Sequence, residues 1–169
     1  SAALSDVLRD DLQLRAILER LAYSAHQREA CSDEAVALER RDLLALLEQA
    51  EYLGEVGLAA ELLDYVDQRA GLLVGQGGGG GQLPRTYTFP HRTFQEYLAG
   101  CHMVGQRGID REYWGRAGES DTWYLAAQLG AEELLYNRRS ENDVLDLAYA
   151  RSPRGASPED EPWDERRWR

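Results

Sequence analysis

The feature that most constrains the fold is a run of five glycines, Gly77 to Gly81, near the middle of the chain. Glycine has no side chain to pack and loses the most conformational freedom on folding, so such a run is disfavoured inside a helix or strand. Leu72 to Val74 precedes it as a short apolar run, and Thr86 to Phe89 follows with alternating polar and aromatic residues. These flanking segments predict two strands that pair as a hairpin, with the glycines as a long, flexible tip.

Amphipathic helices are predicted before this hairpin, because apolar residues recur there at spacings of three and four. The segments are 4–25, 41–50 and 58–70. A polar break at 24–33 and a short apolar run at 36–38, which fits a brief strand or the entry to a helix, separate the first two. Gly54 and Gly57 interrupt the pattern after the second helix, and Gly71 stands where a glycine often ends a helix.

The helix after the hairpin is predicted to begin at Thr93, because Thr93 and Glu96 have the spacing of a capping box. Its core positions recur with helical spacing: Phe94, Tyr97, Leu98, Cys101 and Val104. Gly105 and Gly108 are expected to end it. Further helices are predicted at 121–136, 141–150 and from 163 onward, with a proline-containing loop at 151–162.

The order of these elements is that of a winged helix followed by helices. We therefore expect a mainly α protein, with an α+β winged helix carrying a small β-hairpin wing and a trailing helix over 1–105. Residues 106–169 are expected to form a helical, solenoid-like region or helical sensor domain, with the boundary near 105–110. Helical pattern at both ends suggests a piece of a longer protein.

Composition excludes several classes of enzyme. All 19 basic residues are arginine, and the chain has no lysine. A P-loop and a protein kinase need a lysine at the phosphates, and a Schiff-base enzyme needs one for its covalent bond. The serines lack a nucleophile-elbow motif, and Glu96 has no nucleophile or metal cluster near it in sequence. We expect no catalytic residue and no metal site in this chain.

Charge and cysteine usage bear on partners and compartment. The formal net charge is −11, which argues against nucleic-acid binding, because that affinity comes mainly from neutralising phosphates. Cys31 and Cys101 lie far apart and form no disulfide framework or metal-ligand spacing. No signal peptide and no run of about 18 apolar residues is present. We therefore expect a cytoplasmic protein that binds no membrane.

The candidate binding residues are His91 and, second to it, Arg92, which lie at the start of the helix after the hairpin. The start of a helix attracts anions, because its first backbone amides lack partners within the helix. His91 and Arg92 could therefore contact a phosphate held by another domain. The plain alternative is that His91 only fixes the corner between strand and helix. His26 and His102 are interpreted as surface or packing residues.

The segment from Phe89 to Ala99 carries a resemblance to a known family. It reads Phe-Pro-His-Arg-Thr-Phe-Gln-Glu-Tyr-Leu-Ala. With Arg69 to Val74 and the glycine tip, it resembles the winged-helix region that follows the nucleotide-binding domain of NACHT-type signalling NTPases, which belong to the AAA-like STAND class. The resemblance covers residues 1–105, most clearly 65–104, and the helices after Tyr113 are similar to those of bacterial members.

This resemblance implies a switch element. In the family, a histidine at the position of His91 reaches the phosphates of bound ADP and helps to hold the closed, inactive state. The implied partner is the nucleotide-binding domain of the same parent chain, which would bind ADP or ATP with Mg²⁺. The Walker motifs are missing from this sequence, so the fragment alone would bind and hydrolyse no nucleotide. Self-association of the parent on activation is left open.

Two other functions remain open on the sequence. One is a protein-protein interaction or scaffold module, in which the helices after Tyr113 bind another protein and nothing switches. The other is a DNA-binding winged helix, whose recognition helix would be 58–70. Its acidic residues Glu61, Asp64 and Asp67 outnumber Arg69 and would repel phosphate.

Overall fold

The computed structural model describes residues 2–29, 37–49, 52–105, 121–139 and 142–143. The described part of the chain is mainly α with one small antiparallel sheet, as the sequence predicts. The elements are α1 (Ala2–Arg9), α2 (Asp11–Glu29), β1 (Leu38–Glu39), α3 (Arg40–Leu47), α4 (Val56–Gln68), β2 (Val74–Gln76), β3 (Thr86–Thr88), α5 (Arg92–Gly105), α7 (Asp121–Glu132) and the π-helical segment η1 (Glu133–Arg138).

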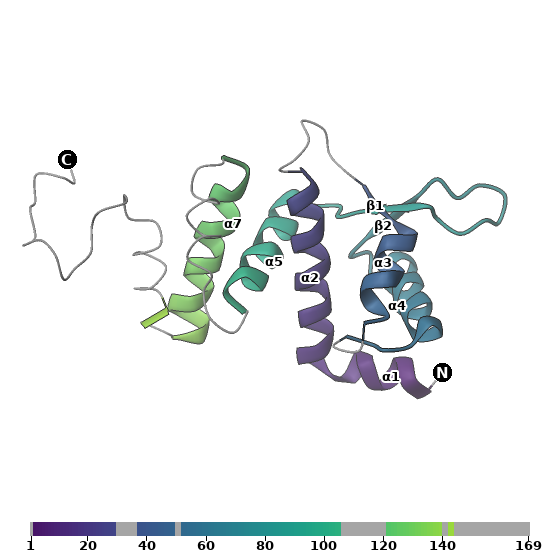
Figure 1. The fold of residues 1–169 in the computed structure, drawn as a ribbon, viewed down its shortest axis with the longest axis horizontal. Coiled ribbons are helices and arrows are strands. Elements are labelled where there is room, and N and C mark those ends of the chain that lie inside the picture. Colours follow the sequence, from purple (N-terminus) through teal and green to yellow (C-terminus); the bar gives the residue numbers. More distant parts are fainter. Residues whose placement is uncertain (1, 30–36, 50–51, 106–120, 140–141, 144–169) are drawn as a thin grey trace, which may run out of the picture.

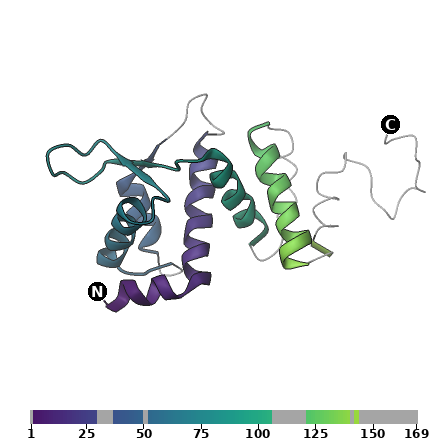
Figure 2. The same cartoon turned by 180° about the vertical axis from the view of Figure 1, so that it is seen from behind.

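The long helices lie in a row. Figures 1 and 2 show α7, α5 and α2 side by side, with α3 and α4 on the other side of α2 and α1 across its end. The loop between β2 and β3 projects away from the helices, on the side opposite to α7 (Figure 1). Because α5 lies between α2 and α7, it connects the two ends of the described structure.

The predicted hairpin is confirmed, and it gains a third strand. β2 and β3 pair antiparallel, with Gly75 opposite Tyr87, and β1 pairs with the other edge of β3, with Leu38 opposite Tyr87. The strand order is β1-β3-β2. The first strand of the hairpin is predicted at 72–74 but lies at 74–76, because the backbone N–H groups of Leu72 and Leu73 donate to the Val66 carbonyl in the last turn of α4.

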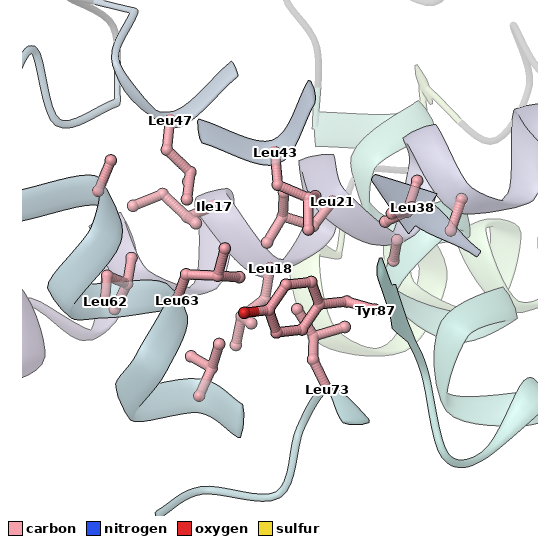
Figure 3. Packing of buried hydrophobic residues seen from close by; sticks show 14 of the residues in the cluster. Ile17, Leu18, Leu21, Leu38, Leu43, Leu47, Leu62, Leu63, Leu73 and Tyr87 are labelled. Carbon is pink, nitrogen blue, oxygen red and sulfur yellow. The ribbon is translucent and has the colours of Figure 1, made fainter. Parts of the chain in front are cut away.

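The core fills the space between α2, α3, α4 and the sheet (Figure 3). Its fully buried residues include Ile17, Leu21, Leu38, Leu43, Leu47, Leu62, Leu63, Leu73 and Tyr87. Burial raises the pKa of the Tyr87 hydroxyl, which accepts a hydrogen bond from the guanidinium of Arg40. The buried ring therefore keeps a partner for its polar end.

The first predicted helix is in fact two helices. The single helix predicted at 4–25 breaks at Asp10, whose carboxylate accepts a hydrogen bond from the backbone N–H of Gln13 at 3.0 Å. This is the contact of an N-cap residue, so Asp10 ends α1 and begins α2. The predicted polar break at 24–33 is also wrong for residues 24–29, because α2 continues to Glu29 and buries Ala25 and His26.

The capping box predicted at Thr93 is not formed. α5 begins at Arg92, and the carbonyl oxygen of His91 already accepts the first helical hydrogen bond, from the N–H of Gln95 at 3.1 Å. His91 is therefore the N-cap, and Thr93 lies exposed in the first turn. Glu96 forms an ion pair with Arg92 at 3.1 Å instead of reaching back to an N-cap amide.

The remaining predicted elements agree within about a turn, which is the usual uncertainty of helix ends. Gly57 was expected to interrupt the helical pattern but lies inside α4, and the helix predicted at 121–136 changes from α to π geometry at Glu133. The boundary near 105–110, most of the helix at 141–150 and all features after it lie outside the described residues.

Candidate functional site

The sequence-predicted site residues lie together at the exposed start of α5. His91 and Arg92 are both exposed, and Phe89 and Pro90 connect them to β3, the central strand of the sheet. α5 is 14 residues long, so the dipole of a full helix points from its C-terminus toward this end. The first amides of such a helix have no acceptors within the helix, and they favour an anion.

The corner before α5 is held by other residues than the His91 side chain. Phe89 is buried, and its ring lies 6.4 Å from that of Phe94 in an edge-to-face arrangement. His91 contributes its backbone carbonyl to the corner, as the acceptor for Gln95. The His91 imidazole itself is exposed.

Arg92 is less available than His91. Its Nε donates a hydrogen bond to Glu96 Oε1 at 3.1 Å, and the Glu96 side chain is 8% exposed. The Arg92 side chain itself is 67% exposed, so the rest of the guanidinium faces solvent. The sequence-based order, with His91 as the first candidate contact and Arg92 as the second, stays a prediction.

A polar cluster that no spacing in the sequence indicates joins α2, α5 and η1. Glu133 is 4% exposed, and its Oε1 accepts a hydrogen bond from Arg15 Nη2 at 2.8 Å. Its Oε2 accepts hydrogen bonds from the Tyr97 hydroxyl at 3.1 Å and from Asn137. Arg15 Nε also donates to Glu19 Oε1 at 2.8 Å. We call Arg15, Glu19, Tyr97 and Glu133 the three-helix ion cluster.

Hydrogen bonds and a neighbouring charge decide the ionisation of Glu133 in this cluster. Burial alone would raise the pKa of the Glu133 carboxyl, but hydrogen bonds from Asn137 and Tyr97 and the charge of Arg15 outweigh it and lower that pKa. Burial and the neighbouring carboxylate raise the pKa of Tyr97 to about 12. A carboxylate that is ionised and fully hydrogen-bonded is a poor general base, so the cluster fits a structural role.

Cys101 lies beside this cluster and shows no sign of a reactive thiol. The residue is completely buried, and its Sγ is 3.6 Å from Arg15 Nη2. Burial raises the pKa of the Cys101 thiol, although hydrogen bonds from Tyr97 and Arg15 oppose this rise. The thiolate is the nucleophilic form, so a raised pKa makes the sulfur inert at neutral pH. Cys31 lies outside the described residues.

The other two histidines are packing residues, one of the two interpretations predicted for them. The His26 side chain is completely buried, and its ring lies 4.5 Å from that of Trp123 on α7. His102 is 9% exposed, and its ring lies 4.8 Å from that of Tyr23. Spacing along one helix could not reveal these contacts, because each pairs residues of different helices.

Neither a metal site nor a membrane span is found in the described structure. Within residues 2–29, 37–49, 52–105, 121–139 and 142–143, no three His, Cys, Asp or Glu side chains come together in a way that could hold a metal ion. None of the helices formed by the described residues is long and apolar enough to cross a bilayer.

The chain matches no family model, curated protein or solved structure. A functional proposal therefore rests on its own residues.

Proposed function

We propose that this chain is the regulatory, non-catalytic winged-helix module of a NACHT-type signalling NTPase of the STAND class, and that it holds the ADP-bound, closed state of its parent. The observation that carries this proposal is the exposed imidazole of His91 at the N-cap of α5. The resemblance over residues 89–99 supports the same role for this residue. ADP or ATP with Mg²⁺ would be bound by the nucleotide-binding domain of the parent protein.

The proposed mechanism depends on a contact between this module and the nucleotide that forms in one state of the parent and not in the other. His91 and the first amides of α5 would meet a phosphate of ADP in the closed state, and exchange for ATP would remove that contact and release the module. A hydrogen bond to a charged phosphate contributes about 1.5–3 kcal/mol. That energy shifts a two-state population by about tenfold to a hundredfold, which is enough to bias the switch without locking it.

The first test is the coding sequence upstream of Ser1. The proposal requires a nucleotide-binding domain in the same chain, with a Gly-x-x-x-x-Gly-Lys-Ser/Thr loop. Finding this loop in the same reading frame would support the proposal. A start codon directly before Ser1, with no such loop, would contradict it, because His91 would then have no nucleotide to contact within its own chain.

The second test is the ADP affinity of the parent protein with His91→Ala. We expect the dissociation constant of ADP to rise about tenfold to a hundredfold, because one hydrogen bond to a charged group is lost. ATP affinity should change by less than this, since the contact belongs to the closed state. Isothermal titration calorimetry measures both constants.

Thr93→Ala is the matched control. Thr93 is exposed in the same first turn of α5, and its side chain carries no charge. We expect this variant to bind ADP as the parent does. Equal ADP affinity in His91→Ala and Thr93→Ala would remove the basis of the proposed contact.

A scaffold function is the second candidate, and one observation favours it. Apolar side chains are exposed on α7 and η1: Tyr124, Leu125, Leu135 and Tyr136. Exposed apolar patches often mark protein-protein contacts. The DNA-binding alternative gains no comparable support, because Glu61 of the candidate recognition helix α4 is exposed and would repel phosphate.

A further inference from the structure

His26 lies at the place where three helices meet. It belongs to α2, and its completely buried ring packs against Trp123 of α7 at 4.5 Å with the two ring planes at 86°. Its Nε2 lies 2.8 Å from the backbone carbonyl oxygen of Thr122, in the first turn of α7. Gln95 of α5 closes the same region by donating a hydrogen bond to Glu29 at 3.1 Å. One imidazole thus holds the start of α7 to α2.

The hydrogen bond to Thr122 fixes the tautomer of the ring. A carbonyl oxygen can only accept, so Nε2 carries the hydrogen and Nδ1 is left with a lone pair. Among the described residues, the buried Nδ1 has no hydrogen-bond partner. Glu29 Oε2 is 3.9 Å away, beyond hydrogen-bond distance, and already accepts from Gln95. A proton on Nδ1 would therefore place a buried cation whose ion pair with Glu29 Oε2 is long, at 3.9 Å, and shared with Gln95.

The charged groups that face His26 do not compensate for this burial. Glu29 on α2 and Glu96 on α5 favour the protonated ring, whereas Arg92 on α5 opposes it, and Arg92 and Glu96 pair with each other at 3.1 Å. From α7 the ring meets the Thr122 carbonyl and the Trp123 indole. Burial has the largest influence and lowers the pKa of His26 below its usual value.

We propose that His26 is a pH-sensitive latch, which holds α7 against α2 and α5 while its ring is neutral and releases α7 when Nδ1 is protonated. The latch rests on the contacts within this chain and is independent of the proposed contact of His91 with ADP. The released form exposes His26 to water, where its pKa returns to about 6.5.

The sign of the effect follows from proton linkage. Between the usual pKa and the lowered value of the docked form, the released form binds more protons. The ratio of released to docked protein therefore rises about tenfold for each unit that the pH falls in this window. Above about pH 6.5 both forms are neutral, and the ratio is constant.

The experiment is amide hydrogen exchange of the full 169-residue chain at several pH values from 7.5 to 5, corrected for the intrinsic exchange rate. In the unsubstituted chain we expect the protection of 121–132 to fall about tenfold or more over this range, while 58–66 in α4 keeps its protection. In His26→Gln, whose side-chain amide donates to Thr122 without titrating, protection of 121–132 should change less than about twofold. His91→Gln, at an exposed histidine, should keep the full pH dependence.

Three results of the exchange experiment would overturn the latch. The first is a pH-independent protection of 121–132 in the unsubstituted chain, and the second is an undiminished pH dependence in His26→Gln. The third is a parallel loss of protection in α4, which would mean global unfolding. If His26→Gln does not fold, the pKa of the His26 ring, measured by NMR titration of the unsubstituted chain, takes the place of this variant. A pKa clearly below about 6.5 supports the latch, and a value at or above it overturns the proposal.

Discussion

The single buried side chain of Glu133 connects three elements of this molecule. Its carboxylate receives hydrogen bonds from three elements: Arg15 on α2, Tyr97 on α5, and Asn137 within η1. The Glu133 side chain is 3% exposed, whereas that of Arg15 is 44% exposed, so solvent partly screens the charge of the arginine. The hydrogen bonds to the carboxylate therefore contribute more than the net attraction between the charges.

We predict that Glu133→Ala lowers the free energy of unfolding by about 1.5–3 kcal/mol at pH 7, because several donors lose a charged acceptor. Glu132→Ala is the control, since Glu132 is the exposed neighbour on the same segment, and it should change stability by less than about 0.5 kcal/mol. Urea unfolding measures both. An equal effect of the two substitutions would contradict the role of the buried carboxylate.

The pH dependence of this effect has a definite sign. The pKa of Glu133 is lowered in the folded protein, so its stabilising contribution is present above the unfolded value of about 4.3. The contribution is lost as the pH falls through the lowered value. The difference in stability between the unsubstituted chain and Glu133→Ala should therefore shrink between pH 5 and pH 3. A constant difference over this range would contradict the assignment.

Some residue roles could be predicted from the sequence and others could not. Leu98, Cys101 and Val104 are buried, as their helical spacing predicts. Gln95 and Glu96 are also buried, which the spacing of the apolar residues does not predict. An apolar period cannot reveal a buried polar residue, because its burial depends on partners in distant segments, such as Glu29 for Gln95.

At the scale of elements, α5 and α7 approach each other closely at a pair of glycines. A Cβ on Gly100 would lie 2.2 Å from the carbonyl oxygen of Ala126, and a Cβ on Gly130 would lie 2.7 Å from that of Gly100. These distances are shorter than any normal contact and involve rigid backbone. The two helices can therefore pack at this distance only because both positions are glycine.

We predict that Gly100→Ala separates α5 from α7 and lowers the free energy of unfolding by about 1–3 kcal/mol, as overpacking does. Gly57→Ala in α4 is the matched control, because nothing lies within 4 Å of its added Cβ. That substitution should leave stability unchanged or raise it by up to about 1 kcal/mol, since alanine favours the helix. Urea unfolding compares the two, and a destabilisation by Gly57→Ala as large as that by Gly100→Ala would contradict this account.

The helices themselves follow from periodicity, but several of their ends do not. The break at Asp10 depends on one side-chain contact to Gln13, and the apolar pattern continues across it. The start of α5 at Arg92 depends on the His91 carbonyl, although the spacing of Thr93 and Glu96 suggests a later start. Local capping contacts decide where a helix begins or ends, and neighbouring residues in the sequence can offer more than one such contact.

At the scale of the whole molecule, the order of elements predicts the small sheet and the helices around it. The sequence does not predict that α7 packs along α5 and α2, because the two glycines that join α7 to α5 and the buried His26 that joins it to α2 lie far from their partners in the chain. The arrangement leaves the start of α5 exposed while the rest of that helix is enclosed between α2 and α7. Any domain that binds His91 would thus act on α5, which packs against both α2 and α7.

The most direct test of the central proposal is amide hydrogen exchange at residues 91–95 in the parent protein, compared between its ADP-bound and ATP-bound states. These amides form the start of α5, where the phosphate contact is proposed. We predict slower exchange with ADP than with ATP, because only the closed state would place a phosphate on these amides. Equal exchange in the two states would contradict the account, since α5 would then not sense the nucleotide.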